Sequence, residues 1–295
     1  MSGFFYDAFM NPAILEQKES FRQAMIDKLG PLPVDFAEKL EFIHSTQHTS
    51  ERYSAAGVLL LLHFRKDPAS HMSGQGEYCF QLIKRSARIS QPGDLSCPGG
   101  MLAPFLDAVL KPVIARGLIP VVDGTAKAYI RQRPADTVDA LMLLLTSAVR
   151  ESWEEIRLSP FNIEFLGPLP CHSLILFRRT IFPMVVMVKN TPSYRLNHEV
   201  DRIVEIPLKA FFQEENYARY QIKAEDSMRR GDQASWEFPC FIQREGKNGQ
   251  DILWGATFHI ILHFLETLFD FALPDIRSNP VLSRTLQQSY LTGNK

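Results

Sequence analysis

The sequence has few cysteines, almost no net charge and no long hydrophobic run. Its four cysteines, at positions 79, 97, 171 and 240, are far apart and lack metal-ligand or redox spacing, so we expect buried thiols and no disulfide framework. A formal net charge of −1 over 295 residues leaves no basic footprint, and we expect no nucleic-acid partner.

No segment is apolar for long enough to span a membrane. The longest apolar runs cover residues 57–64 and 140–149, well short of the roughly 20 residues that a spanning helix needs. The start of the sequence lacks the basic and apolar regions of a secretory signal. We therefore expect a soluble, cytoplasmic protein with no membrane partner.

The composition is that of an ordinary globular protein, with 45% hydrophobic and 22% charged residues. Residues 1–45 are predicted to form an N-terminal helical extension, whose amphipathic helices break at the Gly-Pro-Leu-Pro stretch of residues 30–33. The main domain is expected over residues 46–272. Residues 273–295 form a C-terminal tail, which we expect to be loose.

Extended and helical segments alternate in an order that favours an α+β fold, a sheet flanked by helices. A long helix is predicted over residues 137–157 with Asp136 as its N-cap, and a last apolar helix over residues 257–270. Strands are predicted at residues 54–64, 77–85, 162–167, 174–189 and 199–207, followed by a hairpin over residues 237–255. Asn248-Gly249 supplies the positive φ angles of a tight hairpin turn.

The end of the long helix carries an acidic cluster within "SAVRESWEEIRLSP". Residues three and four apart share a helix face, so Glu151 lies beside Glu154 and Glu155, and such like-charge pairs each destabilise a helix by about 0.2–0.5 kcal/mol. Arg150 is placed to pair with Glu154, but this leaves negative charge to be balanced. Either a metal ion or water and salt balance the remainder.

Gly99 and Gly100 form the centre of the stretch "CPGGM". Two adjacent glycines let a backbone approach a ligand closely and adopt angles that other residues avoid. Taken alone, however, such a pair is most often just a turn. The glycine pair points to a binding site only in combination with the acidic helix that follows it in the sequence.

The stretches "PGG" and "RESWEEIRL" together resemble the Nudix hydrolase signature: a glycine, five residues, a glutamate, seven residues, then Arg-Glu-hydrophobic-x-Glu-Glu-x-Gly-hydrophobic. The upstream segment "LIKRSARISQPGDLSCPGG" is similar to the one that precedes this signature in coenzyme A pyrophosphatase-like members. The segments "NHEVDRIVEIPL" and "ILWGATFHIIL" also resemble that subfamily. Four segments in the same order, between Leu82 and Leu262, thus carry the resemblance.

An insertion separates the two halves of the signature. Arg150 follows Gly100 by 50 residues where the signature has 14, so about 36 residues are extra, over roughly 105–138. The apolar stretch "VLKPVIARGLIPVV" predicts that the insertion packs against the domain. Three roles are open for it: covering the substrate, setting specificity, or forming a homodimer contact.

Substitutions also distinguish this chain from the signature. The first signature glutamate falls at Leu106, and Asp107 comes one place late. Ser152 stands at a hydrophobic position, and Arg157 replaces the final glycine, so we expect another geometry at the helix end. None of these changes removes the helix glutamates.

The resemblance implies a Nudix-type α/β/α sandwich with a mixed central sheet, and it implies Mg²⁺ or Mn²⁺ as the cofactor. It assigns Glu151, Glu154 and Glu155 to the metal and to catalysis, with Arg150 holding a glutamate in place. Divalent ions neutralise a diphosphate and activate water, and Mg²⁺ prefers a few carboxylates together with water and phosphate oxygens.

Other site residues are predicted with a competing interpretation beside each. Arg85 and Arg88 are candidates, with Gly99 and Gly100, for binding the substrate, although solvated surface charge explains the arginines as well. Glu199 and Glu205 are candidates for the general base, and ordinary strand carboxylates are the alternative.

Several other polar residues receive no chemical role. Trp254 and Thr257 stand at a strand-to-helix junction, where a tryptophan usually packs. The remaining histidines of interest lack any partner spacing for a metal site: His172, His198, His259 and His263.

The function expected from the resemblance is metal-dependent cleavage of a diphosphate linkage in a small nucleotide. The subfamily implies coenzyme A or an acyl-coenzyme A, and an ADP-sugar or dinucleotide is the nearest alternative. The rival hypothesis is a non-catalytic Nudix-like module that senses a nucleotide by binding it.

Overall fold

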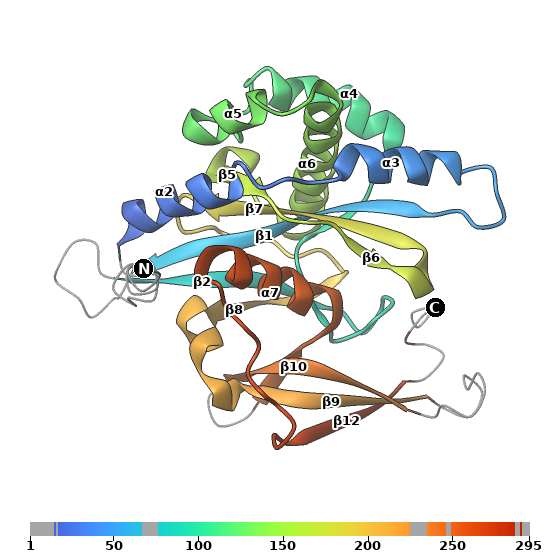
Figure 1. The fold of residues 1–295 in the computed structure, drawn as a ribbon, viewed down its shortest axis with the longest axis vertical. Coiled ribbons are helices and arrows are strands. Elements are labelled where there is room, and N and C mark those ends of the chain that lie inside the picture. Colours follow the sequence, from blue (N-terminus) through green and yellow to red (C-terminus); the bar gives the residue numbers. More distant parts are fainter. Residues whose placement is uncertain are drawn as a thin grey trace, which may run out of the picture.

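The computed structural model describes residues 15, 17–66, 76–224, 235–245, 249–286 and 290. Within these residues the fold is α+β, as predicted: an eight-stranded mixed sheet lies between helices, in an α/β/α sandwich (Figure 1). Helix α6 (Ala135–Ile156) covers one face of this sheet, and α7 (Gly255–Phe269) covers the other. A second sheet of four strands lies beyond α7.

The first sheet has the strand order β3-β2-β1-β7-β5, with β4 paired to β1, β6 to β7 and β8 to β2. Strands β1 and β7 run parallel, and the other pairs are antiparallel. The strands are β1 (Ser54–Lys66), β2 (Gly76–Arg85), β3 (Leu95–Ser96), β4 (Gly99–Met101), β5 (Ile163–Pro168), β6 (His172–Leu174), β7 (Arg179–Val188) and β8 (Val200–Pro207).

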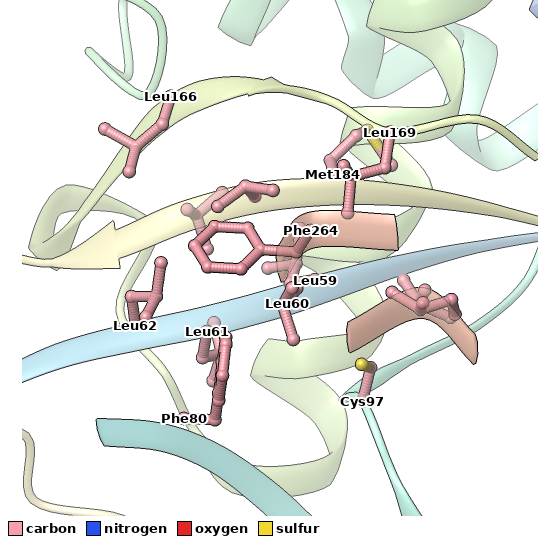
Figure 2. Close-up of a cluster of buried hydrophobic side chains, with 14 of the residues drawn as sticks. Leu59, Leu60, Leu61, Leu62, Phe80, Cys97, Leu166, Leu169, Met184 and Phe264 are labelled. Atoms are coloured by element: carbon pink, nitrogen blue, oxygen red, sulfur yellow. The ribbon is translucent and has the colours of Figure 1, made fainter. Parts of the chain in front are cut away.

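Strand β1 is buried on both faces because helices cover both sides of the sheet. In Figure 2 its leucines 59–62 lie among Phe80 of β2, Met184 of β7 and Phe264 of α7. Gly57 allows α6 to approach the strand: a Cβ there would lie 2.4 Å from the carbonyl oxygen of Leu144.

The N-terminal helices α2 (Lys18–Leu29) and α3 (Phe36–Ser45) pack onto the same core. They break between residues 30 and 35, as predicted from the glycine and prolines. Phe36 is fully buried, with its ring centroid 5.1 Å from that of Phe182, and Arg22 pairs with Glu164 of β5. These helices therefore contribute to the stability of the sheet.

The insertion is helical. It forms α4 (Pro104–Ala115) and α5 (Gly124–Arg131) and leads directly into α6. The prediction of Asp136 as N-cap is wrong: Pro134 holds that position, and Asp136 lies inside the first turn, where it accepts a hydrogen bond from the N–H of Thr137 at 2.6 Å. The helix starts earlier because the proline already has the extended angles of a cap.

Arg157 is the C-cap of helix α6 and has a left-handed conformation, with φ of 56°. The expectation of another geometry at this residue is wrong, because this is the conformation that glycine favours at a helix end. The guanidinium of Arg157 lies over the ring of Trp153, 5.3 Å from its centroid. This contact offsets part of the cost of left-handed angles in a residue with a side chain.

The second sheet has the order β11-β10-β9-β12: β9 (Tyr217–Ala224), β10 (Ser235–Glu245), β11 (Gly249–Leu253) and β12 (Val281–Leu286). The predicted hairpin is confirmed in β10 and β11, and its turn, residues 246–248, lies outside the described residues. Trp254 packs against Tyr220 and Phe238, with centroid distances of 5.2 and 5.9 Å.

The prediction of a loose C-terminal tail is wrong for residues 281–286. They form β12, which pairs in parallel with β9. Arg284 of β12 donates a 2.8 Å hydrogen bond to Asp94, and the hydroxyl of Tyr290 donates another to the same carboxylate. Backbone pairing and a buried charge therefore hold this segment in place.

Two smaller differences from the predictions concern strand and turn lengths. The expected strand over residues 174–189 is split into β6 and β7, with a 3-10 turn between them. The described 3-10 turns are Pro160–Asn162, Ile175–Phe177, Leu208–Phe212 and Glu214–Asn216. All four cysteines are free, and three of them are buried. No helix in the described ranges has both the length and the apolarity that a membrane crossing requires.

Candidate active site

The glycine turn and the acidic helix end, far apart in the sequence, pack against each other. The backbone N–H of Gly99 donates a 2.9 Å hydrogen bond to Oε2 of Glu155, which is buried. A Cβ at Gly100 would lie 2.6 Å from the carboxylate carbon of Glu151. The structure therefore joins the two halves of the signature across the insertion.

Strand pairing explains how the glycines reach this position. In β4, Gly99 and Gly100 pair with Val58 and Gly57 of β1, next to the point where α6 crosses the strand. Gly99 has φ of +135°, and a Cβ there would lie 2.4 Å from the carbonyl oxygen of Gly57. Glycine is therefore required at residue 99 by both backbone angle and space.

Arg150 is the centre of a charge network beside this contact. Its Nε donates to Asp107 at 2.7 Å, and its Nη1 donates to Glu151 at 2.8 Å and to Glu154 at 3.2 Å. Asp107 is fully buried and also accepts a 2.8 Å hydrogen bond from the N–H of Ala103. The hydrogen bond with Asp107, together with the nearby carboxylates, raises the pKa of Arg150. Arg150 thus holds two of the candidate ligands in place.

Sequence reasoning treated Asp107 only as a misplaced signature glutamate. The structure places it directly against Arg150, on the first turns of α4. The signal was the combination of an acidic residue near the signature position with an apolar surrounding sequence. Counting from Gly100 could not identify it, because the inserted helix changes the path of the chain.

Two glutamates have carboxylates that are costly to ionise. Burial is the main cause that raises the pKa of Glu155 to about 8, and the negative charges of Glu151 and Glu199 raise it further. The hydrogen bond from Gly99 acts in the opposite direction. Burial also raises the pKa of Glu151, although Arg150 opposes the shift. A cation beside these carboxylates would relieve both effects.

The donor set has the chemistry that Mg²⁺ or Mn²⁺ requires, because all three glutamates supply oxygen atoms. The described residues contain no group of three or more histidine, cysteine, aspartate or glutamate side chains arranged to hold a metal ion. Glu151 and Glu154 instead contact Arg150, and Glu155 contacts Gly99. Coordination by all three glutamates therefore requires these contacts to be exchanged for contacts with the ion.

Glu199 lies near the acidic helix end. The backbone carbonyl of Glu199 accepts a 2.8 Å hydrogen bond from Ser86, and the N–H of Asn197 donates a 2.8 Å hydrogen bond to the carbonyl oxygen of Glu155. The charge of Glu199 contributes to the raised pKa of Glu155. Of the two base candidates, Glu199 is the one that the structure brings to this site.

Glu205 lies elsewhere on the sheet. It accepts a 2.7 Å hydrogen bond from Gln81 and pairs with Arg65, near the far end of β1 from Gly57. His63 is the main cause, with Gln81 and Arg65, of a pKa lowered to about 2. Because a strand rises about 3.3 Å per residue, His63 and Gly57 are separated by about 20 Å along β1.

The two arginine candidates differ in their surroundings. Arg85, at the end of β2, donates from Nε to the carbonyl oxygen of Ser90 at 2.9 Å. Its positive charge partly opposes the rise in the pKa of Glu155. Arg88 is exposed in the loop that follows, where its backbone N–H donates to Ser86 Oγ at 3.2 Å. Of the two arginines, Arg85 is the one whose charge acts on Glu155 among the causes of its shifted pKa.

Three of the histidines without an assigned role come together. The rings of His172 and His259 stack with centroids 5.4 Å apart and an interplanar angle of 16°. His263 follows His259 by four residues on α7. Burial is the main cause of the lowered pKa of His172 and of His259, and His263 adds to both shifts. Their spacing in the sequence predicted no metal site, and the described residues form no group arranged to hold a metal ion; the contact between His172 and His259 is a stacking contact that this prediction did not address.

An apolar cavity of about 390 Å³ lies on another side of α6, between this helix and α4. Its lining includes Ile114, Val149, Trp153 and Phe161, with Arg150 at its border. The glutamates Glu151 and Glu155 do not line it, and Arg150 is the residue that it shares with the candidate site.

Comparison with known proteins gives only distant similarity. No family model and no curated protein matches the chain. Similar solved structures include a C. elegans Ap4A hydrolase in a binary complex, with 13% identity, a TM-score of 0.32 and coverage of 52% of this chain and 80% of that chain. They also include the M. smegmatis Nudix hydrolase RenU, with 13% identity, a TM-score of 0.32 and coverage of 52% and 70%. A Nudix hydrolase from Alicyclobacillus acidocaldarius has 13% identity, a TM-score of 0.36 and coverage of 55% and 82%. Similarity at this level establishes no shared activity.

Proposed function

We propose that this protein is a hydrolase that cleaves a diphosphate linkage in a nucleoside diphosphate derivative, with Mg²⁺ or Mn²⁺ bound by Glu151, Glu154 and Glu155. The observation that carries the proposal is the contact between the glycine turn and the acidic helix end. Gly99 donates to Glu155, and Gly100 leaves just enough space for Glu151. The signature's two halves meet although the insertion separates them in sequence.

Each residue of the site has a distinct task in this reaction. A divalent ion, when bound, neutralises the diphosphate and activates water. Arg150 orients Glu151 and Glu154, and the N–H of Gly99 orients Glu155. Glu199 is the base that we propose accepts the proton of the attacking water, because it is the base candidate nearest to Glu155.

We propose coenzyme A or an acyl-coenzyme A as the substrate, with a phosphopantetheine and adenosine 3',5'-bisphosphate as products. Support comes from two of the segments that resemble coenzyme A pyrophosphatases, because they are hydrogen-bonded to each other and to the end of α6. Ser86 of the first segment donates to Glu199 of the next, and Asn197 donates to Glu155. An ADP-sugar or a dinucleotide is the alternative substrate of the same reaction class.

A nucleotide-binding sensor is a second candidate function. The observation in its favour is that Arg150 already contacts Asp107, Glu151 and Glu154, so its charge partly neutralises the cluster. A binding module needs only this partial neutralisation of the carboxylates by Arg150. A hydrolase needs Glu151 and Glu154 to leave Arg150 and bind the metal ion.

The test is product analysis with a matched pair of variants. Purified protein is incubated with Mg²⁺ or Mn²⁺ and coenzyme A, acetyl-coenzyme A, NADH, ADP-ribose or a diadenosine compound, and products are identified by mass spectrometry. We expect metal-dependent cleavage that Glu154→Gln abolishes. The control, Glu266→Gln, makes the same charge change on the exposed side of α7 and should cleave normally. Tight binding of one compound without cleavage by the wild-type protein would favour the sensor.

A further inference from the structure

Arg179, at the start of β7, is a half-buried arginine without a counter-charge. No side chain among the described residues pairs with it, and its Nε is buried without a hydrogen-bond partner. Arginine remains charged in proteins, and a buried donor without an acceptor destabilises a fold. The structure therefore contains a fixed positive charge whose acceptor is not part of the described chain.

Sheet register places Arg179 beside the histidines. In the β6–β7 pair, Arg179 is opposite Leu174 and Ile181 is opposite His172, so all four side chains share one face of the sheet. Helix α7 packs against β6, and His259 of α7 stacks on His172. Arg179 and the imidazoles thus line the same side of the sheet.

A second arginine lies close to this group. Burial lowers the pKa of Arg179, and the charge of Arg85 adds to this shift. The guanidinium of Arg85 donates to Ser90 but pairs with no carboxylate among the described residues. Two like charges in a half-buried place repel each other unless an anion lies with them. The charge of Arg85 also opposes the rise in the pKa of Glu155, so Arg85 lies within electrostatic reach of both the acidic helix end and Arg179.

The imidazoles add neutral donors to this cationic group. Burial, followed by the charges of neighbouring histidines, lowers the pKa of His172 and that of His259, so both rings are neutral near pH 7. A neutral imidazole can donate one N–H to an oxygen atom. Although His263 lies on the same helix as His259, the described residues form no group of three or more side chains arranged to hold a metal ion. Guanidinium groups and imidazole N–H groups together are suited to a phosphate oxyanion.

We propose that Arg179, with Arg85, His172 and His259, forms an anion subsite that binds a phosphate group of the substrate. The assignment of this oxyanion to the substrate rests on the proposed function, whereas the subsite itself rests on the geometry above. Two sources supply the same chemistry: the second phosphoryl group of the diphosphate, or a separate phosphate monoester on the nucleoside.

The test measures anion binding without metal or turnover. Titration calorimetry in the presence of a chelator uses inorganic diphosphate, AMP and adenosine 3',5'-bisphosphate as probes for the full-length protein. We expect Arg179→Gln to weaken binding of at least one probe by about tenfold or more. The control is Arg178→Gln, which removes the same charge from an exposed neighbour that pairs with Glu51 at 3.6 Å. It should bind every probe as the wild-type protein does.

The probes distinguish the two sources of the oxyanion. If diphosphate binding alone depends on Arg179, the subsite holds the second phosphoryl group. If adenosine 3',5'-bisphosphate binds more tightly than AMP, and Arg179→Gln removes the difference, the subsite holds a separate monoester. Equal affinities of wild type and Arg179→Gln for every probe overturn the proposal. Normal binding without hydrolysis would contradict the proposed function and leave the subsite established.

Thermal unfolding separates binding from a structural role of Arg179. Without ligand, Arg179→Gln should melt at or above the wild-type temperature, because it removes an unpaired buried donor and a repulsion. A lower melting temperature with unchanged anion binding overturns the proposal. Arg179→Lys keeps the charge but loses the planar fork, so intermediate binding is expected. It also provides the binding test if Arg179→Gln does not fold.

Discussion

Gly99 and Glu155 are 56 positions apart, and the N–H of the first donates a 2.9 Å hydrogen bond to the carboxylate of the second. This bond fixes one candidate metal ligand against a backbone that only glycine can form, because Gly99 has φ of +135°. The adjacent Gly100 contacts the neighbouring ligand, Glu151. The two glycines therefore have different tasks, which substitution can separate.

Gly100→Ala should reduce activity and preserve the fold. The new Cβ would lie 2.6 Å from the Glu151 carboxylate, which ends a flexible side chain and is able to move away. Displacement of a ligand by about 1 Å costs on the order of 100-fold in rate. Steady-state kinetics and thermal melting measure the two effects.

Two further alanine variants are controls for this prediction. Gly249→Ala places its Cβ in open space, at a residue that pairs in β11 and for which the structure records no positive φ, in contrast to the turn predicted there, so both readouts should be unchanged. Gly99→Ala meets the Gly57 backbone at 2.4 Å and should lower the melting temperature markedly. Full activity in Gly100→Ala would contradict the assignment of Glu151 to the site.

Asp107→Ala should destabilise the protein strongly. The substitution leaves Arg150, whose side chain is 11% exposed, without its main partner, and breaking a buried pair in this way costs on the order of 3 kcal/mol. Urea unfolding measures this loss. Asp139→Ala is the matched control, because Asp139 pairs with Lys111 at the surface and should cost less than about 1 kcal/mol. Equal effects of the two substitutions would refute a central role for Asp107.

Arg284→Ala should loosen the C-terminal strand. Arg284 donates to Asp94 at 2.8 Å and to the carbonyl oxygen of Pro92 at 2.9 Å, and both contacts are half-buried. We expect a loss of roughly 1.5–3 kcal/mol, as for hydrogen bonds to charged groups, together with faster hydrogen exchange in β12. Arg277→Ala, at an exposed pair with Asp275, should not shift the unfolding midpoint. Unchanged exchange in β12 would count against this anchor.

Protonation of Glu205 should reduce the stability of the protein in acid. Its pKa is lowered to about 2 by His63, Gln81 and Arg65, so its contribution to stability is complete above the unfolded-state pKa near 4.5. That contribution is lost as the pH falls from about 4.5 toward 2. Glu205→Gln should therefore show a shallower decline of the free energy of unfolding over this range. Parallel pH curves for the variant and the wild type would exclude this role.

The sequence predicted the parts of the fold that local patterns determine. The long apolar period of α6 and the apolar runs of β1, β2 and β8 were all recognisable, because burial requires them. Strands β9 and β12 were not predicted. They have mixed polarity, and their pairing joins residues about sixty positions apart, which no local pattern specifies.

The candidate site shows the same division. The acidic cluster and the glycine pair were predicted from their spacing and resemblance, and the structure brings them together. The pair of Arg150 with Glu154 was predicted and is confirmed, whereas the pair of Arg150 with Asp107 was not predicted, because α4 carries Asp107 into place by its own geometry. The group of Arg179 and the histidines was missed because His172 and His259 meet only through sheet and helix packing.

The bond between Asp107 and Arg150 changes how the insertion should be regarded. A segment that merely lengthens a loop can be shortened, since closing a longer loop costs little. Here the segment supplies the negative charge that orients the arginine at the heart of the acidic cluster. A chain shortened across residues 105–138 would therefore lose Asp107 as well. The guanidinium of Arg150 would then have only the helix glutamates as partners and would no longer be held in its present orientation. The insertion and the acidic end of α6 thus depend on each other, and we expect a substitution at Asp107 to alter the positions of the side chains around Arg150.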